Sequence, residues 1–61
     1  MGVSCGMPGE TARLLLAGQG YPFDPFQPGM THWMRSEDGH FEVEVMTDLD
    51  NTVLSVAVRL L

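Results

Sequence analysis

The sequence has no lysine, one cysteine and no long hydrophobic run, and each absence narrows what the chain can be. Arg13, Arg35 and Arg59 face eight carboxylates, which gives a formal net charge of −5. Because nucleic-acid binding needs several lysine or arginine contacts to phosphates, we expect no direct binding to DNA or RNA. An acidic surface suits a larger protein with a basic patch, although it also serves solubility alone.

The cysteine count and the chain length limit how the fold is stabilised. Cys5 has no second thiol, so an internal disulfide is excluded and a structural zinc site or redox dithiol is disfavoured. A chain of 61 residues buries only a small core. We therefore expect binding to a partner, or to a second copy, to supplement its stability.

Targeting signals are also lacking in the sequence. The opening MGVSCGMPGE has neither the basic start nor the apolar run of a secretory signal. The longest apolar runs, such as LLLA, are far too short to span a bilayer. The expectation is a cytoplasmic protein without membrane contact.

The first part of the chain is read as a tail, a helix and a connection. Residues 1–7 are rich in glycine, lack periodicity and resemble a flexible tail. A short helix is predicted over 8–18, where Ala12, Leu15 and Leu16 share one face. Such a helix is too short to persist alone, so it must dock on the remainder of the chain.

The connection over 19–30 contains YPFDPFQPG, with prolines every three residues as in a polyproline II ligand. No basic residue flanks the prolines in 21–29, which disfavours a displayed ligand. The favoured interpretation is a stiff lid that packs some of Tyr21, Phe23 and Phe26 against the fold. The alternative leaves these rings exposed as a binding hot spot.

Period-two alternation predicts strands over 31–36, 40–46 and 52–60, separated by turn-forming SEDGH and TDLDNT. The predicted fold is therefore α+β, a single domain over 8–61 with one helix followed by a three-stranded antiparallel meander. The last segment also fits a helical stripe, but its β-branched residues favour strand.

The turns suggest a register for each hairpin. A three-residue loop ending at Gly39 sets Trp33 against Val43 on the core face and His32 against Glu44 outside. A two-residue turn would instead oppose Trp33 to Glu44 and leave the indole in solvent. The first is preferred because burial of the indole is favourable.

For the second hairpin, a four-residue loop pairs Val45 with Leu54 and Val43 with Val56. A three-residue loop would set serine and alanine against these valines and is rejected. In this arrangement the third strand has an uncovered edge.

In the preferred register, His32, His40, Glu42 and Glu44 gather on the outer face of the sheet. Two imidazoles and two carboxylates could hold a divalent metal, but the spacing lacks a tight ligand motif. A solvated surface pair is the simpler reading, so no metal or cofactor is expected. One helix on one sheet rarely encloses a pocket, so no enzyme is expected.

Two segments resemble known families. The run GMTHWMRSEDGHFEVEV resembles the central hairpin of HicA-type toxins, which implies RNA cleavage with His32 as the catalytic residue and a closing helix from Thr52. Thr31 stands where that family has serine, and its basic RNA-binding residues are missing. The run DGHFEVEVMTDLDNTVLSVAVR is similar to the hairpin of PepSY domains, which implies an inhibitor-like binding role.

The sequence therefore favours a small acidic non-enzymatic module that regulates or inhibits a larger protein with a basic or apolar patch. A HicA-like toxin and a structural subunit of a larger assembly remain the alternatives. A homodimer through the last strand is also expected. The candidate binding residues are Tyr21, Phe23, Phe26, Glu42, Glu44, Leu54 and Val56.

Overall fold

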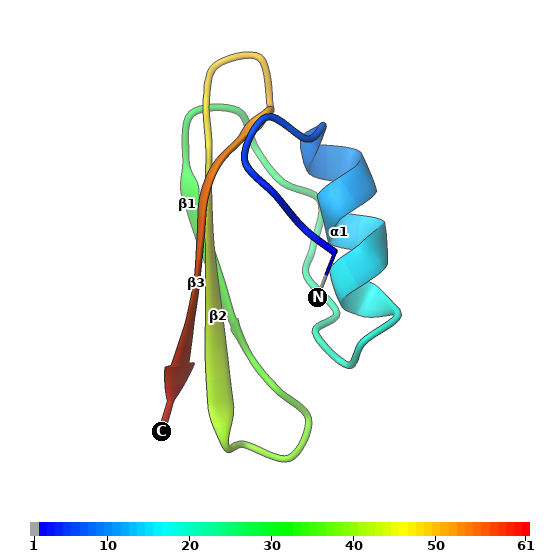
Figure 1. Ribbon diagram of the computed structural model, residues 1–61, viewed down its shortest axis with the longest axis vertical. Helices are drawn as coiled ribbons and strands as arrows, with labels where there is room; N and C mark the ends of the chain where they lie inside the picture. The colour runs from blue at the N-terminus through cyan, green and yellow to red at the C-terminus, as the bar shows by residue number, and fades with distance from the viewer. Residues whose placement is uncertain (1) are drawn as a thin grey trace.

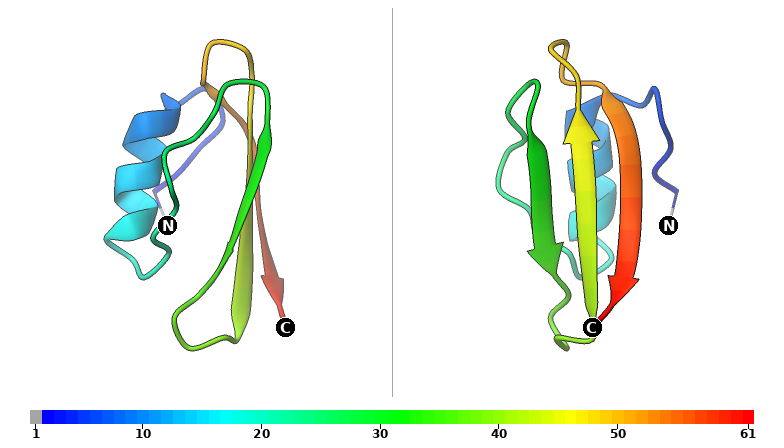
Figure 2. Two further views of the ribbon diagram at one scale, coloured as in Figure 1. Left: turned by 180° about the vertical axis from the view of Figure 1, so that it is seen from behind. Right: turned by 90° about the vertical axis from the view of Figure 1, so that its left-hand side faces the viewer.

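The computed structural model describes residues 2–61 and confirms the predicted αβββ layout (Figure 1). The elements, in chain order, are α1 (Gly9–Ala17), β1 (Thr31–Arg35), β2 (Phe41–Thr47) and β3 (Val53–Leu60). The strands form one antiparallel sheet in the order β1-β2-β3. Figure 2 shows α1 behind one face of this sheet, and no helix over the other face. The nine-residue α1 is too short to cross a bilayer, and it is the only helix in the described part of the chain.

The helix docks through one narrow face of its surface. Ala12 and Leu16 are fully buried, whereas Leu15, predicted on the same face, is 39% exposed at its margin. Glu10 in the first turn pairs with Arg13 one turn later. The side-chain hydrogen bond from this guanidinium lowers the pKa of Glu10 and raises that of Arg13.

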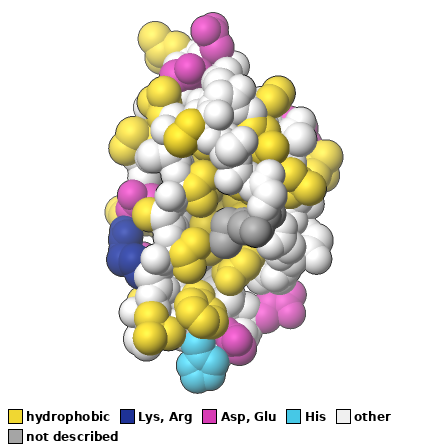
Figure 3. Space-filling model, viewed as in Figure 1, with side chains coloured by type: hydrophobic (Ala, Val, Ile, Leu, Met, Phe, Trp, Pro, Cys, Tyr) yellow, Lys and Arg dark blue, Asp and Glu magenta, His cyan; other side chains and the backbone are white. Residues whose placement is uncertain are grey.

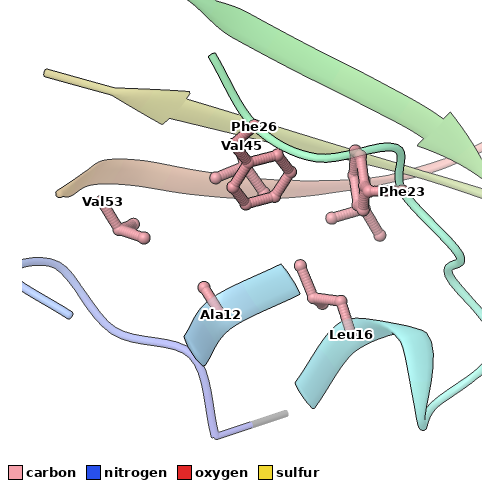
Figure 4. Close-up of a cluster of buried hydrophobic side chains, with 7 residues drawn as sticks. Ala12, Leu16, Phe23, Phe26, Val45 and Val53 are labelled. Atoms are coloured by element: carbon pink, nitrogen blue, oxygen red, sulfur yellow. The ribbon is translucent and has the colours of Figure 1, made fainter. Parts of the chain in front are cut away.

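The proline-rich connection returns between the helix and the sheet and fills the core. Phe23 and Phe26 are each 6% exposed and meet edge to face, with ring centroids 5.2 Å apart (Figure 4). This confirms the lid interpretation for these two rings. The buried hydrophobic residues are Ala12, Leu16, Phe23, Phe26, Val43, Val45 and Val53.

The preferred register of the first hairpin is wrong: the strands pair as in the alternative, although the loop has four residues instead of two. Trp33 lies opposite Glu44 with 63% of its surface exposed, while His32 lies opposite Val45 on the core face. Two physical reasons account for this. Phe23 and Phe26 already supply large buried rings to this core, and the His32 imidazole lies against Phe26 with ring centroids 4.6 Å apart.

The turn itself fixes that register. The Ser36 N–H donates to the Phe41 carbonyl at 2.8 Å, which closes a four-residue loop. The Asp38 carboxylate accepts hydrogen bonds from the Ser36 hydroxyl and the His40 N–H, and these lower its pKa. Gly39 takes a positive φ of 76°, as predicted for this position.

The second hairpin is shifted by two residues from the predicted register. Val45 pairs with Val56, and Val43 with Val58. One residue of this shift comes from the turn: the Asp48 N–H donates to the Thr52 carbonyl at 2.9 Å, which closes the three-residue loop that was rejected from the sequence. The other comes from a bulge: Met46 pairs with Ser55 and Thr47 with Val53, so that Leu54 between them is unpaired. The strand prediction for this segment is confirmed over the helical alternative.

The N-terminal residues differ from the expected tail. The Gly6 N–H donates to the Val53 carbonyl at 2.8 Å, and the Val53 N–H donates to the Met7 carbonyl at 2.8 Å. Pro8 forms an isolated bridge with Thr52. These contacts join the segment before α1 to the beginning of β3, and periodicity analysis missed them because so short a pairing has no repeating pattern.

Candidate functional site

The candidate site is the part of the β3 edge that the rest of the chain leaves unpaired. The N-terminal segment hydrogen bonds to Val53 at the beginning of the strand. Within residues 2–61, no backbone hydrogen bond from that segment reaches β3 beyond this point. Figure 2 shows β3 as an outer strand of the sheet, with the N-terminal segment beside its first part. Unpaired strand edges of this kind are the template for strand addition.

The backbone polar groups of this edge follow from one hydrogen bond. The Leu61 N–H donates to the His40 carbonyl at 2.8 Å, so position 61 faces β2. In an antiparallel ladder, residues alternate between facing the neighbouring strand and facing away from it. Val56, Val58 and Leu60 therefore direct their N–H and C=O groups to the open edge.

The side chains along the same edge are apolar and accessible. Val58 is 47% exposed, Leu60 77% and Leu61 55%, while Val56 is half-buried against the core. Leu54, the bulge residue, is 50% exposed. The lower end of the sheet extends past α1 (Figure 1), so the helix does not cover this part of β3.

The sequence predicted binding through this strand at Leu54 and Val56, and the structure adds Val58 and Leu60 to its exposed apolar edge. On the ladder, Val58 and Leu60 carry most of the exposed apolar surface. One signal could have revealed the register shift. Val53 and Leu54 are adjacent apolar residues at the point where alternation begins, which is typical of a bulge.

The acidic face is less acidic than the sequence suggests. Glu42 and Glu44 lie on the outer face of β2, but Arg59 of β3 reaches both carboxylates. Its Nη2 is 2.7 Å from Glu44 Oε2, and its Nε is 3.8 Å from Glu42 Oε1. Exposed pairs of this kind add little stability. One guanidinium against two carboxylates nevertheless halves the local negative charge. On the face drawn in Figure 3, hydrophobic side chains occupy the middle and most carboxylates lie near the ends.

The aromatic candidates are not displayed. Phe23 and Phe26 are buried, and Tyr21 is half-buried against the core. Trp33, which was expected inside, is instead the large aromatic group on the outer face.

The register change also disperses the predicted histidine–carboxylate cluster. His32 Nε2 accepts the Gln27 N–H at 2.9 Å on the core side, while His40 lies in the turn. Over the described 2–61 range, no three histidine, cysteine or carboxylate side chains gather as a metal site. A shallow hollow of about 240 Å³ lies beside His32, between the connection and β1.

The HicA resemblance fails at its closing element. The segment from Thr52 leads into strand β3 and not into a helix. The His32 Nε2 accepts the Gln27 N–H at 2.9 Å, and the imidazole lies 4.6 Å from the Phe26 ring.

Comparison with known proteins gives no relatives: no family model, no curated protein and no solved structure matches this chain.

Proposed function

We propose that this chain is a small protein-binding module that takes up an extended segment of a larger protein on the open edge of β3. One observation carries the proposal: Val56, Val58 and Leu60 direct unpaired backbone groups outward beside exposed apolar side chains. Main-chain hydrogen bonds would give affinity, and alternate side chains would give specificity.

The partner segment is expected to be apolar and weakly charged. The only charged residue in β3 is Arg59, and it is already paired with Glu42 and Glu44. The net charge of −5 would steer a basic partner toward the molecule without fixing it at the edge. Binding should therefore depend only weakly on salt. A partner held in this way has one of its segments withheld from other contacts, which is the basis for a regulatory or inhibitory role.

The test uses two substitutions at one position. Val58→Pro removes an outward N–H and leaves the β2–β3 ladder intact, because proline is tolerated on the open side of edge strands. Val58→Thr keeps the backbone donor and nearly the same shape. Both variants and the wild type are immobilised, and captured proteins from a lysate of the source organism are quantified by mass spectrometry.

We expect a protein captured by the wild type to be retained by the threonine variant and lost with the proline variant. Circular dichroism establishes that each bait is folded. Capture that is equal for wild type and a folded Val58→Pro variant would overturn the proposal, as would loss of capture that follows salt concentration alone.

A further inference from the structure

We infer that a second copy of this chain occupies the β3 edge when no partner is bound, so that the resting form is a two-fold dimer with a continuous six-stranded sheet. The inference rests on the proposed function only in using the same edge. An occupant must offer an unpaired strand with exposed apolar side chains and little charge. β3 itself meets each requirement.

The charge distribution favours self-pairing at this edge. Two chains of net charge −5 repel each other in general. β3, however, contains no carboxylate, and its one cation is balanced by Glu42 and Glu44 of the same chain. Two β3 edges can therefore approach without bringing carboxylates face to face.

The length of β3 and the N-terminal segment limit the register of the pair. An axis at Arg59 would pair only residues 58–60 of β3, because the strand ends at Leu60. An axis nearer to Val53 would collide with the N-terminal residues that already hydrogen bond there. The two-fold axis is thereby confined to Ala57 and Val58.

This register matches both the backbone and the side chains. With the axis at Val58, the outward-facing Val56 meets Leu60 of the second copy, and Val58 meets its own equivalent. An axis at Ala57 gives the same alternation, with Val56 opposite Val58. Exposed apolar side chains on the helix side of each sheet are then covered by the same kind of side chain. The contact is isologous, so it closes at two chains.

The strand edge is short, so the dimer is expected to be weak. Seven or eight residues a side bury less surface than a standard permanent interface. We expect sedimentation equilibrium of the full chain, from micromolar to millimolar concentration, to show the average mass rising from 6.7 kDa toward twice that value.

Substitutions locate the contact. Val58→Lys and Val58→Pro should each raise the dissociation constant at least tenfold. Leu14→Lys is the matched control: this side chain is 59% exposed on α1, away from β3, and its replacement should leave the constant within twofold of wild type. A monomeric wild type at millimolar concentration would overturn the inference, as would an equal effect of the three variants.

A spin label reports the register and does not depend on a disruptive variant. The label is a nitroxide on the introduced cysteine of Ala57→Cys, in a chain whose own thiol is removed by Cys5→Ser. In the dimer it lies opposite or diagonal to its equivalent across the axis. Backbone separations there are about 5–8 Å, and strong dipolar broadening is expected. Sharp spectra from a sample that sediments as a dimer would place the contact elsewhere and refute the inference.

The two proposals fail separately. A monomeric wild type whose capture of a partner is sensitive to Val58→Pro refutes the dimer and leaves the binding function standing. A dimer disrupted by Val58→Pro, with capture unchanged by that substitution, refutes the binding function and leaves the dimer standing.

Discussion

Leu14 and Leu16 of α1 point in different directions, and comparing them tests whether the buried core stabilises this fold. Leu16 is fully buried among the rings of the connection and the valines of β2, whereas Leu14 is 59% exposed. Replacing either by alanine removes the same three carbons from the same helix. The two substitutions therefore differ mainly in burial.

The expected magnitudes follow from that difference. Three buried carbons contribute about 2.4 kcal/mol by transfer, and the cavity left by Leu16→Ala raises the loss to about 3 kcal/mol. Leu14→Ala forfeits less than half of the transfer contribution and leaves no cavity, so its cost is about 1 kcal/mol or less. A domain of this size has only about 3–5 kcal/mol in total. Leu16→Ala should therefore leave the chain barely folded.

Urea denaturation followed by far-ultraviolet circular dichroism measures both losses. Trp33 fluorescence is a weaker probe, because the indole is already largely exposed in the folded state. With a denaturant slope of about 1 kcal/mol per molar, the midpoint should fall by about 3 M for Leu16→Ala and by about 1 M or less for Leu14→Ala. Protein concentration is held constant because association shifts the midpoint. Equal losses for the two variants would refute the assignment of the core.

Three further predictions concern the contact of β2 with the connection, the helix start and the first turn. Thr47→Val should lower the free energy of unfolding by about 1–2 kcal/mol, because the buried Thr47 hydroxyl donates to the Gln27 carbonyl at 3.0 Å and valine leaves that carbonyl unpaired. Gly9→Ala should cost about 1–3 kcal/mol, because a methyl group there would lie 2.7 Å from the Asn51 carbonyl oxygen. Asp38 has a pKa lowered from 3.8, chiefly by the Ser36 hydroxyl, so its stabilisation is present above about pH 3.8 and is lost as the pH falls through the lower folded value. The urea midpoint of wild type should therefore approach that of Asp38→Asn between pH 5 and pH 2.

Each of these has its own contrary result. A Thr47→Val midpoint that matches wild type would mean that the hydroxyl contributes nothing. Gly18→Ala is the control for the helix start, since the nearest atom to its new methyl group is 3.6 Å away and its φ of −68° suits alanine. Because alanine favours the helix more than glycine does, a loss at Gly18 as large as that of Gly9→Ala would mean that the cost does not come from the Asn51 contact. A gap between wild type and Asp38→Asn that stays constant down to pH 2 would exclude the carboxylate.

The order and type of the elements could be predicted from the sequence, because alternation in β2 and β3 and the spacing of Ala12 and Leu16 are strong local patterns. Register could not. It depends on which large side chains fill the core, and Phe23 and Phe26 do so through contacts distant in the chain while Trp33 stays exposed. Alternation cannot signal these contacts.

The candidate site was predictable to the level of the strand. A strand at the end of a meander has an open edge, and apolar residues through VLSVAVRLL identified it. The exact positions depended on the bulge at Leu54 and on the pairing of Gly6 and Met7 with Val53. Both are single-residue features of three-dimensional packing, without a periodic signature in the sequence.

Because the backbone groups of β3 face β2 and the open edge in turn, successive amide protons should exchange with solvent at different rates. Val53 donates to Met7, so its proton should exchange slowly with deuterated water even in an isolated chain. The outward amides of Val56, Val58 and Leu60 should exchange within the dead time until another chain accepts their hydrogen bonds. Protection at these three sites, with no change at the positions between them, would record occupancy of the edge whatever the identity of the molecule that fills it.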